Sequence, residues 1–210
     1  TLTLLKEKLE SKRISVNGSV QIGKLQGKKK IFSISHSIDS IVYRANKESD
    51  NLCAENLLKI IAAERNSIPA VADSGIQLEK NYFASIGIDT AKIVIADGSG
   101  VSDYNLVSAN HLIQLLQAMY NDKKNYSTFF VSLPIAGLDG TLKNRMKNSS
   151  AEKNVFAKTG TKKGINCLAG YAKKKNGEQL AFAVLINHFY GEPKVLRGAI
   201  DKFIIEMISE

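Results

Sequence analysis

The chain has 210 residues, of which 44% are hydrophobic, and its formal net charge at pH 7 is +9. It contains no run of 18 or more apolar residues, which excludes a transmembrane helix, and charges follow the first apolar residues too closely for a signal peptide. The basic balance favours anionic partners such as nucleic acid, an anionic wall polymer or a membrane surface, although a solvated basic surface is the simpler explanation. Because the chain does not begin with Met, we expect a processed chain or a fragment of a longer one.

Apolar residues at helical spacing predict helices along much of the chain. The clearest helix spans residues 52–65, because the preceding Ser49-Asp50-Asn51 suits an N-cap. Ser108 is expected to cap a further helix. The predicted helices cover residues 3–12, 37–46, 52–65, 81–88, 108–121, 141–146 and 193–208. A loop is expected over residues 67–80, which contain Pro69 and Gly75, with a short helix at its end as the alternative.

The final third of the chain carries the clearest strand pattern. Asn176-Gly177 between two apolar runs is a strong hairpin signal, and Pro193 then opens the last helix at its first position. We expect that helix to turn four residues toward the core, namely Val195, Ala199, Phe203 and Met207. The predicted strands cover residues 14–22, 31–35, 154–161, 165–173 and 179–189, with a turn over residues 27–30 between the first two.

These elements predict an α+β fold class: an antiparallel sheet with helices on its faces, a C-terminal helix behind it and an inserted helical segment. No internal repeat or low-complexity linker divides the sequence. The simplest organisation is therefore one domain over residues 1–210.

The cysteines and histidines do not suggest a metal site. Cys53 and Cys167 each sit in an apolar pattern, which favours two reduced core residues, although a disulfide stays possible. His36, His111 and His188 are scattered, without metal-ligand spacing. The lysine clusters lack interleaved aromatic residues and match no nucleic-acid-binding module. We therefore expect no metal, no cofactor and no nucleic-acid partner.

Three polar stretches are candidates for chemistry, and each also has an ordinary structural explanation. Ser49-Asp50-Asn51 suits a helix cap, and residues 97–105 are rich in turn formers and suit a strand-to-helix loop. Lys158-Thr159-Gly160 follows an apolar strand, but the three-residue pattern is common by chance.

The combination of these stretches is more informative than any one of them. Ser-Asp-Asn at a helix start and Lys-Thr-Gly on a strand are two of the three signature elements of penicillin-recognising serine acyltransferases. A lysine beside a threonine hydroxyl suits a substrate carboxylate, and Gly160 lets a peptide lie along the strand edge. A backbone N–H just after Gly160 suits a developing oxyanion.

With both elements in place, the chain resembles the C-terminal part of class C penicillin-binding proteins, the D-alanyl-D-alanine carboxypeptidases/endopeptidases of the penicillin-binding protein 4 type. The resemblance begins near His36. It implies part of a β-lactamase/transpeptidase-like fold. It is carried by four ordered blocks, namely residues 46–56, 97–105, 132–142 and 157–171.

The resemblance implies catalytic roles for Ser49, Asn51 and Lys158. Ser49 would relay a proton between the nucleophile and the leaving amine, and Asn51 would hold a substrate amide. Lys158 and Thr159 would bind the terminal D-Ala carboxylate beside Gly160. The N–H of Thr161 would supply half of the oxyanion hole.

The resemblance also implies supporting residues around the cleft. Val101 and Lys162 would line the pocket for a substrate side chain. The stretch from Asp97 to Asn105, with Ser102, would support the cleft. Ser102 to Asn105 is one residue too long for a Ser-x-Asn element, so Ser49-Asp50-Asn51 is our choice for that element.

The family's nucleophile, a serine in a Ser-x-x-Lys element on a helix far upstream, has no convincing counterpart here. The only literal match is Ser150-Ala-Glu-Lys153, which lies on a predicted polar loop rather than at a buried helix start. Thr3-Leu-Leu-Lys6 has the lysine spacing alone. We therefore expect the chain to lack the acylating serine, its lysine base and the first strands of the sheet.

The resemblance implies a serine-type enzyme of the periplasm or cell envelope that cleaves peptidoglycan stem peptides ending in D-Ala-D-Ala and is acylated by β-lactams. Our first hypothesis is a fragment of such an enzyme, inactive alone, whose partner is the missing N-terminal segment. The second is a non-catalytic peptidoglycan- or partner-binding module that keeps the carboxylate-binding strand. The third is a basic nucleic-acid or surface binder whose motifs are coincidental.

Overall fold

The computed structural model describes residues 2–21, 33–65 and 69–209. Its contacts divide the chain into two compact units, Thr1–Ser35 and His36–Glu210. That residues 1–210 form one domain stays a prediction. In the described part of the chain, no helix is long and apolar enough to cross a membrane.

Among its described residues, 2–21 and 33–35, the first unit contains one helix, α1 (Leu2–Ser11), as the spacing of its leucines predicts. The strand predicted over residues 14–22 is wrong in its described part, because residues 14–21 form no strand. Those residues are almost all exposed, so their alternating pattern has no sheet to pack against. The predicted turn at 27–30 lies outside the described residues, as do residues 31 and 32 of the second predicted strand, whose residues 33–35 are not in a strand.

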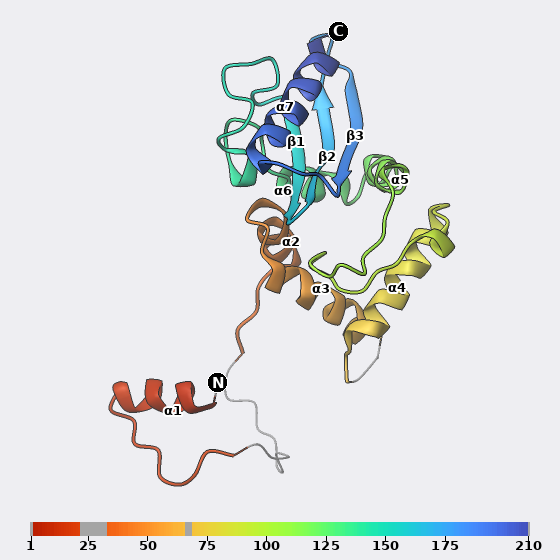
Figure 1. Cartoon of the computed structure of the whole chain (residues 1–210). Helices are drawn as coiled ribbons and strands as arrows, with labels where there is room; N and C mark the ends of the chain where they lie inside the picture. The colour runs from red at the N-terminus through yellow and green to blue at the C-terminus, as the bar shows by residue number, and fades with distance from the viewer. Residues whose placement is uncertain (1, 22–32, 66–68, 210) are drawn as a thin grey trace. The chain divides into compact units, whose positions relative to one another are not determined.

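The second unit contains the remaining elements. A mostly helical part comes first, followed by the sheet and then a final helix (Figure 1). Its α-helices are α2 (Ile38–Lys47), α3 (Asn51–Glu64), α4 (Ala72–Ser85), α5 (Ala109–Asn121), α6 (Tyr126–Ser132) and α7 (Pro193–Ser209). Its strands are β1 (Val155–Lys162), β2 (Ile165–Lys173) and β3 (Gln179–Asn187), and its 3₁₀ turns are η1 (Thr90–Lys92) and η2 (Gly140–Leu142). The helix predicted over residues 141–146 is thus only the short turn η2.

The sheet has the order β1-β2-β3, and both pairs are antiparallel. The hairpin predicted at Asn176-Gly177 is confirmed: Gly177 has φ of 86°, and its N–H donates to Lys174 O at 3.0 Å. Glycine adopts that backbone without a steric penalty, which explains the tight turn between β2 and β3.

Two apolar clusters fix the sheet from its two faces. On one face, Val155 and Leu168 pack with Ile200 and Ile204 of α7 in the main core, and Figure 1 shows α7 lying along the sheet. On the other face, the side chain of Tyr171 packs with residues of α5 and α6, and its hydroxyl donates to Leu116 O at 2.6 Å. Helices therefore pack on both faces of the sheet, and this packing fixes the position of β1. Both cysteines, Cys53 and Cys167, are free and half-buried.

The predicted inner face of α7 is wrong by one residue. Val195 and Phe203 are 73% and 55% exposed, and Ala199 is also exposed, whereas Ile200, Ile204 and Ile208 are buried. The helix carries two adjacent apolar stripes with the same four-residue spacing, so periodicity alone does not choose between them. Met207 does pack against the core.

The loop predicted over residues 67–80 is wrong from Ala72 onward, because α4 runs unbroken from Ala72 to Ser85; residues 67 and 68 lie outside the described residues. A Cβ added at Gly75 would lie 2.2 Å from Leu58 O, so the backbones of α3 and α4 approach each other closely at this glycine. Gly75 is therefore a helix-packing residue rather than a helix breaker. The sequence predicts that this helical segment ends at Gly87. In the structure, Gly87 lies in the turn just after α4, where its φ is 84°.

Candidate active site

The junction between α2 and α3 leaves the hydroxyl of Ser49 available, because Asp50 takes the helix cap. Asp50 Oδ1 accepts a hydrogen bond from Cys53 N at 3.0 Å, and Oδ2 accepts one from Arg44 Nε at 2.6 Å. These hydrogen bonds, the backbone one first, hold the pKa of the Asp50 carboxyl below its usual range. Ser49 itself has φ of 56°, in the left-handed region. The cap interpretation of this motif is confirmed for Asp50 alone.

Lys158 on β1 contacts Ser49 directly. Lys158 Nζ donates to Ser49 Oγ at 2.7 Å and to Thr159 O at 2.8 Å. Burial lowers the pKa of Lys158, because the charged form loses hydration. Two of the three motifs singled out in the sequence thus meet at one hydrogen bond.

No carboxylate neutralises Lys158 among the residues that the structure describes, since none of their ion pairs includes it. A largely buried ammonium group with only neutral partners is costly to keep charged. An incoming anion would remove that cost. Lys158 therefore provides a site suited to a carboxylate.

The residues after Lys158 continue along the same strand edge. Thr159 Oγ1 donates to Thr141 Oγ1 at 2.9 Å, which joins β1 to the η2 turn. Gly160 pairs with Cys167 of β2, and an added Cβ at Gly160 would lie 3.4 Å from Cys167 Cβ, an ordinary contact. The sheet itself tolerates a side chain at this position, so a requirement for Gly160 would have to come from a bound ligand.

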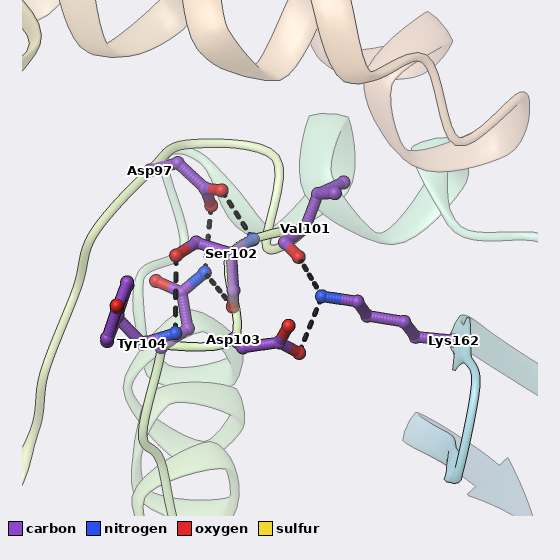
Figure 2. A network of polar contacts seen from close by, with 7 residues as sticks. Asp97, Val101, Ser102, Asp103, Tyr104 and Lys162 are labelled. Carbon is purple, nitrogen blue, oxygen red and sulfur yellow. Dashed lines mark hydrogen bonds and ion pairs between the residues drawn. The ribbon is translucent and has the colours of Figure 1, made fainter.

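The stretch from Asp97 to Asn105 is a turn organised around the Asp97 carboxylate (Figure 2). The carboxylate accepts hydrogen bonds from Gly100 N at 2.7 Å, Ser102 N at 2.6 Å and Asn105 Nδ2 at 2.8 Å. Burial raises the pKa of Asp97, but the hydrogen bonds from Asn105 and the turn N–H groups outweigh it and lower the pKa overall. Asn105 Oδ1 in turn accepts from Ala96 N at 2.8 Å. These contacts hold the turn together, and its role in supporting the cleft stays a prediction.

The turn is fixed against α3 by a close backbone approach. A Cβ at Gly98 would lie 2.7 Å from Ala54 O, so only glycine fits there without displacing the helix. The next residue, Ser99, donates its N–H to Glu55 Oε1 at 3.0 Å. Since α3 begins at the Ser49 motif, the turn and Ser49 are held by the same helix.

Lys162, at the end of β1, joins the strand to this turn. Lys162 Nζ donates to Val101 O at 2.7 Å and to Asp103 Oδ1 at 2.6 Å, and Figure 2 shows the side chain extending from the strand to the turn. The side chains of Lys162 and Asp103 are 36% and 76% exposed, so the ion pair lies at the surface. Lys162 and Val101, predicted to line one pocket, are brought together.

A groove of about 900 Å³ lies between β1, the α2–α3 junction and the 97–105 turn. Ten of the eleven predicted site residues line it: Ser49, Asn51, Val101, Ser102, Asn105, Lys158, Thr159, Gly160, Thr161 and Lys162. Asp97 lines instead an adjacent cavity of about 960 Å³, which shares Ser49, Asn51 and Lys158 with the groove. The structure thus gathers residues that are up to 113 positions apart in the sequence, from Ser49 to Lys162, around one concave surface.

The charged side chains that line the groove are mostly cationic. They are Asp103, Arg145, Lys158, Lys162 and Arg197. Two of the cations are already paired, Arg145 with Asp201 at 2.6 Å and Lys162 with Asp103. The remaining positive charge favours an anionic group in the groove.

The edge of β1 that faces away from β2 lies beside the groove. In the described part of the chain its only bridge on that side joins Ile135 to Phe156, upstream of Lys158. Residues 158–162 thus make no strand pairing on that edge, although Thr159 O accepts from Lys158 Nζ, and the edge is available to a peptide in extended conformation.

Sequence analysis missed several residues that build the site. Asp103 and Thr141 each bond to a predicted site residue, Lys47 lies two positions before Ser49, and Asp139 forms an ion pair with Lys47. Asp139 and Thr141 lie in the 132–142 block that carries the resemblance, and Lys47 lies in the 46–56 block. Their membership of those blocks was the available signal, but their partners follow only from the fold.

The chain is similar to known proteins over most of its length. The chain matches the D-Ala-D-Ala carboxypeptidase 3 (S13) family over residues 1–206. A D-alanyl-D-alanine carboxypeptidase of Actinomadura sp. (strain R39) is 35% identical over 208 residues, which cover 94% of this chain and 38% of that protein. The D-alanyl-D-alanine carboxypeptidase DacB of Haemophilus influenzae is 32% identical over 216 residues, covering 99% of this chain and 44% of that protein. The chain thus spans about two-fifths of the length of these relatives.

Solved structures confirm the expected α+β fold. Penicillin-binding protein 4 of Haemophilus influenzae, in complex with a β-lactam, superposes with a TM-score of 0.86 at 27% identity, covering 99% of this chain and 50% of that one. The TLA-3 extended-spectrum β-lactamase superposes with a TM-score of 0.63 at 19% identity, which shows a shared fold alone. The match over residues 1–206 and the identity to two carboxypeptidases decide the relationship. The chain belongs to the D-Ala-D-Ala carboxypeptidase 3 (S13) family.

Proposed function

We propose that residues 1–210 form one side of the active site of a serine-type D-Ala-D-Ala carboxypeptidase or endopeptidase that acts on peptidoglycan stem peptides. The observation that carries the proposal is the 2.7 Å hydrogen bond from Lys158 Nζ to Ser49 Oγ in the groove wall. An ammonium group that holds a hydroxyl at this distance orients it for proton transfer. Membership of the S13 family supports the same reaction class.

The C-terminal carboxylate of the substrate would bind near Lys158 and the hydroxyl of Thr159. Lys158 has no carboxylate partner among the described residues, and the hydroxyl groups of Thr159 and Thr141 lie 2.9 Å apart beside it. A carboxylate accepts strong hydrogen bonds from both an ammonium and a hydroxyl group. This pairing would select peptides that end in a free carboxylate.

The peptide itself would lie along the open edge of β1. In extended conformation a peptide advances about 3.3 Å per residue, so one whose end is at Lys158 would reach Lys162 within a few residues. Backbone hydrogen bonds to β1 would hold it, with Asn51 contacting a peptide amide from the opposite wall. Val101 and Lys162 would then border a side chain upstream of the cleaved bond.

The reaction would proceed through an acyl-serine intermediate. The serine oxygen attacks the amide carbonyl and gives up its proton, and the N–H of Thr161 helps to bind the oxyanion. Ser49 relays the released proton to the departing amine, which is D-Ala or a cross-linking amine. Water then attacks the ester, which regenerates the serine hydroxyl and releases the shortened peptide acid. A β-lactam would follow the first half of this sequence, because its ring amide opens without a separate leaving group.

The attacking serine would come from outside residues 1–210. The literal Ser-x-x-Lys match places Ser150 in the turns before β1, where its hydroxyl lies 3.0 Å from that of Ser209 at the end of α7. Neither Ser150 nor Lys153 is among the described residues that line the groove. The 210-residue chain alone would therefore be inactive and would need a segment that carries Ser-x-x-Lys. Its working location would be the cell envelope or periplasm, where peptidoglycan stem peptides occur.

The test compares two peptides of the same sequence ending in D-Ala-D-Ala, one with a free C-terminal carboxylate and one with a carboxamide, in the full-length protein that contains these residues. Release of D-Ala from the free acid, with at least roughly tenfold weaker turnover of the amide, is the expected result. Binding of stem peptides without release of D-Ala would instead indicate a non-catalytic binding module. Equal turnover of both peptides would refute the carboxylate role of Lys158.

A further inference from the structure

We propose that the ion pair between the buried Lys47 and Asp139, whose side chain is 33% exposed, is a positioning device for this site, an inference that rests on the proposed function. Neither residue lines the groove among the described residues. The pair would act by fixing two backbone segments, each of which presents one hydroxyl group to β1.

Lys47 is the most deeply buried charged residue of the described chain, with 2% of its surface exposed. Its Nζ donates to Asp139 Oδ1 at 3.0 Å, to Asp139 Oδ2 at 2.9 Å and to Leu133 O. All three N–H donors of the ammonium group are thereby used. Asp139 Oδ1 also accepts from Ile135 N at 2.8 Å, so the carboxylate fixes its own loop as well as α2.

The positions of the two partners in the sequence match the positions of two site contacts. Ser49 follows Lys47 by two residues, and Thr141 follows Asp139 by two residues. Ser49 Oγ then contacts Lys158 Nζ at 2.7 Å, and Thr141 Oγ1 contacts Thr159 Oγ1 at 2.9 Å. Since Lys158 and Thr159 are consecutive in β1, one ion pair sets the spacing of two hydroxyl groups along the strand.

The backbone between each charged residue and its hydroxyl is sharply turned. Ser49 has φ of 56° and Gly140 has φ of 52°, so a left-handed residue occurs in both connections. Gly140 also packs against the other segment, because a Cβ there would lie 2.6 Å from Lys47 O. A serine in this backbone region is held by its surroundings rather than by its own preference. In the described part of the chain, the ion pair between Lys47 and Asp139 joins the two turned segments.

Stability alone gives a weak reason for such a pair. Replacing both members of a buried ion pair with apolar side chains of similar size is often neutral or stabilising, whereas removing one member leaves a buried charge unpaired. The ion pair does, however, fix the direction and the distance between the segments of Lys47 and Asp139, which apolar side chains would not do. Its role is therefore separable from folding by a double substitution.

The experiment compares the full-length protein with the double variant Lys47→Met/Asp139→Leu. We expect its thermal midpoint to stay near that of the parent while kcat for a peptide ending in D-Ala-D-Ala falls roughly tenfold to a hundredfold, as small displacements of catalytic groups produce, with a smaller change in KM. A crystal structure of the variant should show the Ser49–Lys158 and Thr141–Thr159 hydrogen bonds lengthened or lost. The matched control is Lys174→Met/Glu178→Leu, an ion pair at the β2–β3 turn outside the groove, which should leave kcat unchanged.

Two outcomes would overturn the positioning role. One is a double variant that folds, keeps both hydroxyl contacts in its crystal structure and keeps its kcat. The other is a loss of kcat that only mirrors a loss of folded protein, with both contacts intact in the folded fraction. If the parent protein shows no D-Ala release, the proposed function fails instead, and the crystallographic comparison still decides the positioning role.

Discussion

Lys158 Nζ lies 2.7 Å from Ser49 Oγ, although the two residues are 109 positions apart in the chain. The contact joins the start of α3 to the middle of β1, and each of the two elements is fixed by its own packing. Asp50 caps α3 and so frees Ser49, while the core behind β1 and β2 leaves Lys158 facing the groove. The proposed chemistry depends on this one contact more than on any other.

Lys158→Met should abolish the preference for a free C-terminal carboxylate. The methionine keeps most of the volume but removes the ammonium donor to Ser49 and to the substrate. We expect kcat/KM in the full-length protein to fall roughly a hundredfold to a thousandfold, the range seen when a donor to a developing or bound anion is removed. The measurement is release of D-Ala from the acid peptide and of D-alaninamide from the carboxamide peptide. Lys153→Met, at an exposed lysine outside the groove, is the control, and equal losses in both variants would contradict this role.

The same substitution should raise stability at neutral pH. Burial lowers the pKa of Lys158 in the folded state, so between the folded and unfolded pKa values the unfolded chain binds more protons and stability rises with pH. Below the folded pKa the charged lysine therefore carries its full cost, and above the unfolded pKa, near 10.4 for a free lysine, the cost is gone.

The check is the thermal midpoint of Lys158→Met minus that of the parent, measured at several pH values. We expect a positive difference at pH 7 that shrinks as the pH rises toward the unfolded pKa. A difference that is negative at pH 7, or that grows with pH, would show that burial does not disfavour the charged lysine.

Lys162→Met should affect peptide binding more than stability. Lys162 joins β1 to the 97–105 turn through Val101 O and Asp103, and exposed pairs of this kind contribute at most about 1 kcal/mol to folding. Loss of the link should loosen the turn and raise KM for stem peptides several-fold, with kcat largely kept. Lys92→Met removes another exposed lysine–aspartate pair, 2.9 Å from Asp89, and serves as the control. A fall in kcat at constant KM would assign Lys162 to the chemical step instead.

Two glycine substitutions test the packing of the helical part. Gly75→Ala would place a Cβ 2.2 Å from Leu58 O, so we expect the free energy of unfolding to fall by about 1–3 kcal/mol or more. In α7, a Cβ added by Gly198→Ala would lie within 4 Å of no other atom. This substitution should raise the free energy of unfolding by about 0.5–1 kcal/mol. Urea unfolding of both variants measures the difference. Similar values for the two would mean that α3 and α4 are not in close backbone contact.

The sequence predicts the elements whose signals are local. The three strands of the sheet, the Asn176-Gly177 turn and the helix after Ser108 are confirmed because alternation, turn residues and caps act within a few positions. The α4 helix and the buried face of α7 depend on neighbours: Gly75 is explained by Leu58 of another helix, and two apolar stripes on α7 compete for one sheet. Periodicity does not carry that information.

The candidate site divides in the same way. Ser49, Lys158 and their neighbouring motif residues are visible in the sequence because their spacing matches a known pattern, and the structure brings them to one groove. Lys47, Asp139 and Asp103 are ordinary charged residues in sequence. Their roles depend on partners 59 to 92 positions away, and only the fold reveals those partners.

The most direct test of the account is to treat two proteins with a labelled penicillin and to map the acylated residue by mass spectrometry. One is the 210-residue chain and the other is the full-length protein that contains it. The account predicts a single labelled serine in the full-length protein, outside residues 1–210 and followed three positions later by lysine, with no label on the 210-residue chain. A covalent label on any serine within residues 1–210, Ser150 included, would contradict it.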